Sequence, residues 1–88
     1  MATVRVARVG AYGLIRRLKI LVDGTVVASI SRNEMATTYV SSGTHTFTVK
    51  MDWVESPPLV LKFTGAETVY LEAVGGPFRQ DLELRVRK

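Results

Sequence analysis

The chain has 88 residues and a mass of 9.7 kDa, and 47% of its residues are hydrophobic and 23% charged. This length suffices for one small domain, and the composition argues against an intrinsically disordered chain. Cysteine is absent, which excludes disulfides, thiolate nucleophiles and cysteine-based metal sites. The formal net charge is +4, and no apolar run reaches the roughly 20 residues that span a bilayer. We therefore expect a soluble, cytoplasmic protein with a single domain over residues 1–88.

Short runs of alternating apolar and polar residues follow one another along the chain, which is typical of β-strands. The first two runs cover residues 3–9 and 17–22. Asp23-Gly24 follows, and such a pair between alternating runs predicts a hairpin, because glycine adopts positive φ freely. The returning strand is expected over residues 25–30. The inward side chains of the second and third strands are expected to be Leu18, Ile20, Val22, Val26, Ala28 and Ile30.

The clearest alternation covers residues 44–53, where one side is apolar from His45 to Trp53 and the other is mostly threonine. We expect Phe47 and Val49 to be nearly buried and Thr48 to face solvent, since a slip by one residue would exchange the two faces. Proline cannot donate to a ladder, so Pro57-Pro58 ends this strand. The remaining strands are expected at residues 35–40, 59–63, 69–73 and 82–86.

These seven or eight short strands, with turn signals about every 8 to 12 residues and no long helical run between them, predict an all-β fold. Residues 10–16 fit neither pattern and are expected to form a loop. We expect a small antiparallel β-sandwich with an immunoglobulin/fibronectin-like architecture.

The stretch LKILVDGTVVASI, followed by SSGTHTFTVKMDW, resembles the small bacterial β-sandwich modules of the PEGA-like type. Ser42 stands where such modules usually have proline, and the Pro-Glu-Gly-Ala signature is missing. The resemblance implies a β-sandwich that serves as an accessory or interaction domain, and it carries over no catalytic residue. The residues that support the resemblance are Asp23, Gly24, Gly43, His45 and Trp53.

Candidate catalytic chemistry depends on His45, the only histidine. Ser41 and Ser42 precede it without the context of a nucleophile elbow. We expect the His45 ring to pack at the edge of the core, with one ring nitrogen bonded to a backbone carbonyl. Asp52 and Glu55 are interpreted as solvated acids beside the proline turn. The sequence therefore predicts no enzyme, no catalytic residue, no metal site and no cofactor.

Binding is the function class that remains, and the exposed edge of a sheet is a template for adding a further strand. We expect a non-catalytic interaction module that mediates protein-protein contact or self-association. Side chains that combine stacking with charge mark a candidate binding surface. They are Tyr12, Arg16, Arg17 and Trp53.

The alternative is weak binding of an anionic polymer or surface, either nucleic acid or acidic lipid. Residues 1–19 carry a net charge of +5, and the tail from Arg79 adds +2. These charges would form one basic surface if the two ends of the chain meet in the fold. The basic side chains of this alternative are Arg5, Arg8, Arg16, Arg17, Arg85, Arg87 and Lys88.

Overall fold

The computed structural model describes residues 1–9, 17–31, 34–51, 54–75 and 82–87. Within these ranges the chain forms nine strands and no helix. Among the described residues there is accordingly no helix of the length and hydropathy that a membrane span requires. The strands are β1 (Ala2–Val9), β2 (Leu18–Val22), β3 (Thr25–Ile30), β4 (Met35–Val40), β5 (Gly43–Met51), β6 (Val54–Glu55), β7 (Leu59–Phe63), β8 (Thr68–Gly75) and β9 (Leu82–Val86).

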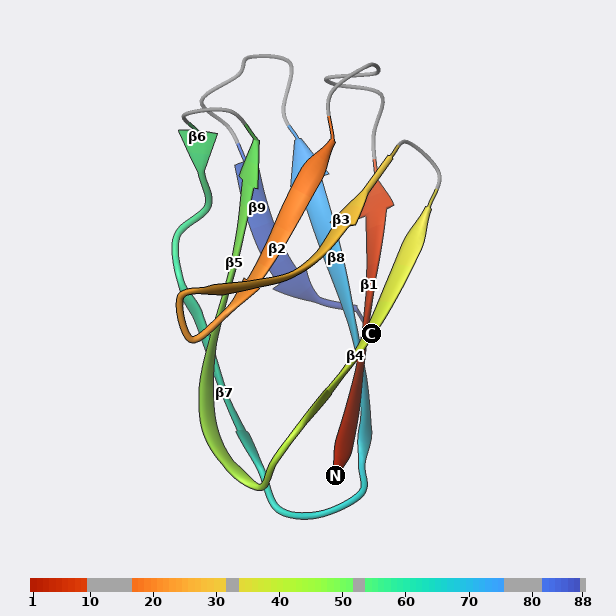
Figure 1. Cartoon of the computed structure of the whole chain (residues 1–88), viewed down its shortest axis with the longest axis vertical. Coiled ribbons are helices and arrows are strands. Elements are labelled where there is room, and N and C mark those ends of the chain that lie inside the picture. The colour runs from red at the N-terminus through yellow and green to blue at the C-terminus, as the bar shows by residue number, and fades with distance from the viewer. Residues whose placement is uncertain (10–16, 32–33, 52–53, 76–81, 88) are drawn as a thin grey trace.

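The strands form two sheets that face each other, one in front of the other in Figure 1. Sheet A has the order β4-β1-β8-β9. Sheet B has the order β3-β2-β5, and both β6 and β7 pair with the far side of β5. The prediction of an all-β fold is confirmed.

Two details of the predicted architecture are wrong. The described residues contain nine strands rather than seven or eight, because the two-residue strand β6 is too short to leave an alternating pattern. The sheets are also not purely antiparallel. Strand β1 pairs in parallel with β8, from Thr3 opposite Thr68 to Val9 opposite Val74, and the other strand pairs are antiparallel.

The core lies between the two sheets and takes side chains from both. Phe47 and Val49 on β5 are fully buried, as their alternation predicts. The Phe47 ring meets Phe63 of β7 edge to face, with 5.9 Å between the ring centres. Leu71 of β8 and Val4 of β1 cover this layer from sheet A and have no exposed surface.

The predicted hairpin at Asp23-Gly24 is present between β2 and β3. Both residues have positive φ, 52° at Asp23 and 84° at Gly24, as the tight turns of two-residue hairpins require. The prediction that Val26 points inward is wrong, since this side chain is 53% exposed. The pairing shifts between Ile20 and Leu21, so Val27 is left over as an extra residue and the alternation of β3 changes sides.

Pro57 and Pro58 interrupt the edge that pairs with β5, and Ser56 bridges the gap. The Ser56 amide donates to the carbonyl of Val49 at 2.9 Å, and the Ser56 hydroxyl accepts a hydrogen bond from the Val49 amide at 3.0 Å. Both backbone groups of Val49 are thereby satisfied although the regular ladder stops. Thr48, expected to face solvent, is only 9% exposed in this central strand.

Candidate functional site

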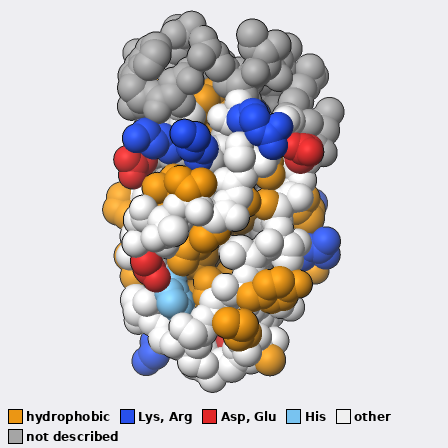
Figure 2. Space-filling view, viewed as in Figure 1, with side chains coloured by type: hydrophobic (Ala, Val, Ile, Leu, Met, Phe, Trp, Pro, Cys, Tyr) orange, Lys and Arg blue, Asp and Glu red, His pale blue; other side chains and the backbone are white. Residues whose placement is uncertain are grey.

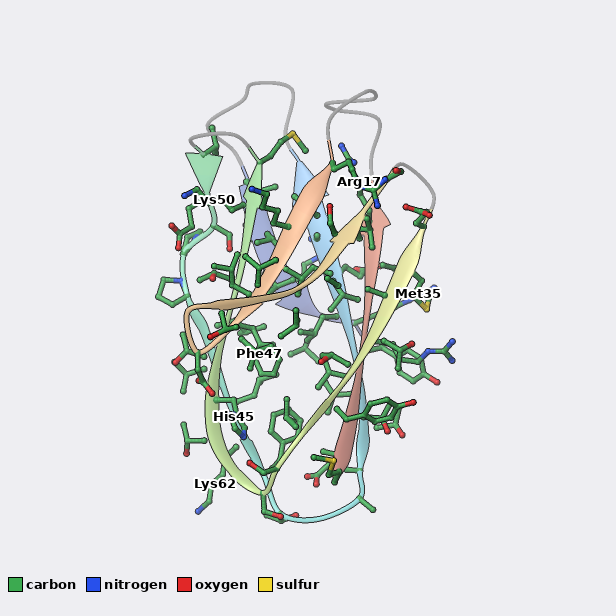
Figure 3. All side chains as sticks on the ribbon, in the orientation of Figure 1. Arg17, Met35, His45, Phe47, Lys50 and Lys62 are labelled. Carbon is green, nitrogen blue, oxygen red and sulfur yellow. The ribbon has the colours of Figure 1, made fainter. Side chains whose placement is uncertain are left out.

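His45 lies near the start of β5, beside the turns that close the lower end of sheet B in Figure 3. Its Nδ1 is 2.7 Å from Oδ2 of Asp23, in the β2–β3 turn. Its Nε2 is 2.9 Å from the backbone carbonyl oxygen of Ser41, in the β4–β5 turn. The other Asp23 oxygen accepts a hydrogen bond from the Thr46 amide at 2.9 Å. His45 thus connects two turns that are distant in the sequence.

Both oxygens that face the His45 ring are acceptors, so both ring nitrogens must donate. This arrangement favours the imidazolium form. The hydrogen bond to Asp23 and, after it, the bond to the Ser41 carbonyl raise the pKa of His45. In turn, the bonds from His45 and from the Thr46 amide lower the pKa of Asp23.

The cluster resembles a serine–histidine–carboxylate arrangement in composition, since Ser41 Oγ lies 3.4 Å from His45 Nε2. A general base must direct a lone pair at the hydroxyl that it activates. Here Nε2 points at the nearer carbonyl oxygen of Ser41, which holds a proton on that nitrogen. This geometry fits a structural role, in which His45 joins the β2–β3 turn to the β4–β5 turn by hydrogen bonds. Among the described residues, no group of three or more His, Asp or Glu side chains is arranged to hold a metal ion.

Of the four residues predicted to form a binding surface, Tyr12, Arg16 and Trp53 lie outside the described residues. Arg17 is described, and its guanidinium joins β2 to the end of β3. Its Nε and Nη2 donate to the hydroxyl and carbonyl of Ser29, at 3.0 and 2.7 Å. These bonds, together with one from Nη1 to the Ser31 hydroxyl at 2.7 Å, engage the Arg17 head group within the fold.

Arg8, predicted to contribute to a basic surface, does not do so. It alternates with Val4 and Val6 on the inward side of β1 and is 8% exposed. Burial lowers its pKa. The prediction failed because Arg8 has the same strand parity as the core residues Val4 and Val6 of β1, so its side chain starts on the inward face.

A band of basic side chains crosses the upper part of the outer face of sheet B (Figure 2). Lys19 of β2 stands directly opposite Lys50 of β5, and both point outward. Arg17 adjoins them, two residues before Lys19 on the same side of the chain. Glu55 is paired with Lys50 in the register and Glu34 lies 3.9 Å from Arg17, so acids offset part of this charge.

The outer face of sheet A brings together basic and aromatic side chains from four strands. On β8, Tyr70 lies opposite Arg5 of β1. On its other side the Arg87 amide donates to the Tyr70 carbonyl at 2.8 Å, so a row runs from Arg5 through Tyr70 to Arg87. Tyr39 of β4 lies opposite Thr3, one step farther along β1. We call this surface the Arg/Tyr face; it consists of Arg5, Met35, Tyr39, Tyr70, Arg85 and Arg87.

The apolar members of the Arg/Tyr face are unusually open to solvent. Tyr39 is 63% exposed, Met35 45% and Tyr70 43%. The side chain of Arg5 forms no hydrogen bond or ion pair with any described residue. Arg85 and Arg87 both approach the carboxylate of Glu72, at 3.4 and 3.7 Å. The two ends of the chain therefore meet on one exposed face, as the anionic-ligand alternative requires.

Sequence reasoning missed several of these residues. The alternation does contain a signal for Tyr39 and Tyr70, because each adjoins a buried residue, Val40 and Leu71, and must point the other way. Asp23 as the partner of His45 carries no such signal, because their contact depends on how two hairpins pack. The position of Arg5 beside Tyr70 depends likewise on the parallel pairing of β1 with β8.

No family model matches the chain, and neither a curated protein nor a solved structure matches it.

Proposed function

We propose that the protein is a non-catalytic binding module that holds an anionic polymer on the Arg/Tyr face. One observation carries the proposal: Arg5 from the start of the chain and Arg87 from its end flank the exposed ring-bearing residue Tyr70. Arginine binds phosphate and other oxyanions through a planar fork of donors. The net charge of +4 adds a favourable long-range field for an anionic ligand.

The non-catalytic part of the proposal is supported by the surroundings of His45. The chain has no cysteine and therefore no thiolate nucleophile, and an imidazole general base could come from His45 alone. Both of its ring nitrogens already donate to oxygens of the fold, those of Asp23 and Ser41. We therefore assign His45 to the stability of the two turns, and we expect no cofactor.

Heparin affinity chromatography tests the binding proposal. The parent protein is expected to be retained at low ionic strength and released by salt, since polyanion binding weakens steeply as salt rises. Arg5→Ala and Arg87→Ala should elute at lower salt. Lys62→Ala is the matched control, because it removes the same charge from an exposed position on β7, in sheet B. The proposal would be contradicted if all three variants eluted at equally reduced salt concentrations, or if the column did not retain the parent protein.

Protein-protein contact or self-association is the second candidate, and the edge strand β3 favours it. Val26 and Val27 are 53% and 42% exposed there, and among the described strands β3 pairs only with β2. An edge with exposed valines is a template for another strand, although the bulge restrains it. Light scattering up to millimolar protein should detect a dimer that Val27→Lys disrupts and Ser42→Lys, in an exposed turn, leaves intact. A monomer at every concentration removes this candidate.

Three further expectations belong to the same proposal. The core shared by two facing sheets supports an immunoglobulin/fibronectin-like β-sandwich. The relationship to PEGA-like modules rests on the resemblance in sequence alone, to which Asp23 and His45 contribute. A cytoplasmic location is supported by the absence of cysteine.

A further inference from the structure

We infer that the polymer on the Arg/Tyr face is a single-stranded nucleic acid whose unpaired bases stack on Tyr70 and Tyr39. This inference rests on the proposed function and specifies its ligand. Polyanions such as polyphosphate need only positive charge, whereas a nucleic acid also offers planar bases. Exposed aromatic rings among the arginines therefore favour a nucleic acid over polyphosphate, because the bases can stack on the rings.

The row through Tyr70 has the geometry of a stacking position with phosphate contacts on both sides. Neighbouring strands lie about 4.8 Å apart, so Arg5 and Arg87 stand one strand to either side of Tyr70. Their long side chains reach around a base that covers the ring. Arg5 has no partner among the described residues, so its full donor set is available to a phosphate.

Tyr39 supplies a second ring at a spacing that suits extended, unpaired nucleotides. It lies two strands from Tyr70 and two residues away along the sheet, about 10 Å across the strands and about 7 Å along them. Thr3 and Arg5 of β1 lie between the two tyrosines, and Thr37 and Thr68 are the other outward neighbours. Both rings stay open to solvent in these surroundings, at 63% exposure for Tyr39 and 43% for Tyr70. Bases that are splayed apart, as in single strands, present their faces to such rings.

The charge of the face favours an anionic ligand over a neutral partner. Three guanidiniums stand against two carboxylates, those of Glu72 and Glu83. Glu72 is 20% exposed and lies within ion-pair distance of Arg85 and Arg87, so it orients these arginines. A duplex hides the faces of its bases, and it would leave both tyrosine rings unused.

Fluorescence anisotropy with a labelled 15-nucleotide single strand of mixed sequence, as DNA and as RNA, tests the inference. Tyr70→Leu and Tyr39→Leu keep an apolar side chain but remove the ring, and each should weaken binding about 5- to 150-fold. Tyr70→Phe should restore affinity, because phenylalanine stacks as well. Arg5→Ala should lower the slope of log affinity against log salt by about 0.7, whereas the leucine variants should leave that slope unchanged.

Two competitors and one control separate the inference from the proposed function. Unlabelled polyphosphate and a duplex of the same sequence should compete less well than the unlabelled single strand. Val60→Ala, at an exposed position on β7, should bind as the parent does. If polyphosphate competes as well as the unlabelled single strand, and Tyr70→Leu binds the single strand with the affinity of the parent, the inference is overturned and polyanion binding remains. If neither polymer binds, both fail. Preference for the duplex, or a tyrosine effect confined to self-association, also overturns the inference.

Discussion

The Asp23 carboxylate and the His45 ring, 22 residues apart in the chain, are joined by a hydrogen bond of 2.7 Å between Oδ2 and Nδ1. The bond connects the β2–β3 turn to β5, and Asp23 also pairs with the backbone of Thr46 through its amide and its second carboxylate oxygen. Three hydrogen bonds therefore anchor one turn to the central strand. Two of the groups that form them titrate.

Stability should fall as the pH rises above the ordinary histidine pKa of about 6.5. The pKa of His45 is raised in the folded protein, so its contribution is fully present below about pH 6.5 and is lost as the pH rises through the folded value. The pKa of Asp23 is lowered, so its contribution is present above about pH 4 and is lost in acid. Thermal melts from pH 4 to pH 9 should give the highest Tm between these limits.

The variant Asp23→Asn separates this pair from other titrating groups. It should flatten the fall in Tm between pH 6 and pH 9, because the neutral amide no longer favours the imidazolium. Glu55→Gln removes an exposed carboxylate of β6 and should keep the parent profile. A fall in Tm that survives Asp23→Asn would mean that another group is responsible.

Phe63→Ala should cost about 3 to 5 kcal/mol of the free energy of unfolding, and Phe47→Ala a similar amount. Both side chains are buried, at 2% and 0% exposure, and their rings are in contact. Such a loss is a large share of the roughly 5 to 10 kcal/mol expected for a domain of this size. Denaturant unfolding measures it. Val60→Ala, 58% exposed on the same strand as Phe63, should change stability by less than about 0.5 kcal/mol.

Ser56→Ala should lower the free energy of unfolding by about 1 to 3 kcal/mol, which is more than the roughly 1 kcal/mol that one hydrogen bond usually contributes. The substitution removes the hydroxyl that accepts from the Val49 amide and leaves that donor buried without a partner. Ser42→Ala changes an exposed serine and should be nearly neutral. Hydrogen exchange gives a second readout, because the Val49 amide should exchange faster in Ser56→Ala. Unchanged protection there would show that water replaces the hydroxyl.

Gly24→Ala should destabilise the protein by about 1 kcal/mol, although an added methyl group meets no atom within 4 Å. The cost is conformational, because φ at Gly24 is +84° and residues with a Cβ rarely adopt that angle. Gly65→Ala also meets open space, but there no positive φ opposes the side chain. This control should be neutral in the same thermal melts. If Gly24→Ala and Gly65→Ala lost the same stability, the cost at Gly24 could not be ascribed to its positive φ.

The local part of this fold could be predicted from the sequence. Turn chemistry identified Asp23-Gly24, and a period of two identified the buried positions of β5, because both depend only on neighbouring residues. Val26 was assigned to the wrong face because a bulge adds a residue without leaving a mark in the pattern. Strand β6 was missed because two residues cannot establish an alternation.

The candidate site could be predicted only in outline. Charge counting along the chain anticipated that its two ends would form a basic surface if they met, and Arg5 and Arg87 do share one face. Arg8 was included wrongly, because a count of charges ignores strand parity. The rings at Tyr39 and Tyr70 were not selected, because their nearness to the arginines follows from strand order, which no local pattern encodes.

The parallel pairing of β1 with β8 has a consequence for how the chain folds. Strand β1 occupies the middle of sheet A, between β4 and β8, yet the register brings Thr3 opposite Thr68. Strand β1 can complete its hydrogen bonds only after β8 has been synthesised, and closing so long a loop is entropically costly. Until residues 68–75 emerge from the ribosome, Val4 and Val6 have a partner on one side only. In the nascent chain one edge of β1 therefore stays open until β8 has been made, and such an open edge favours aggregation.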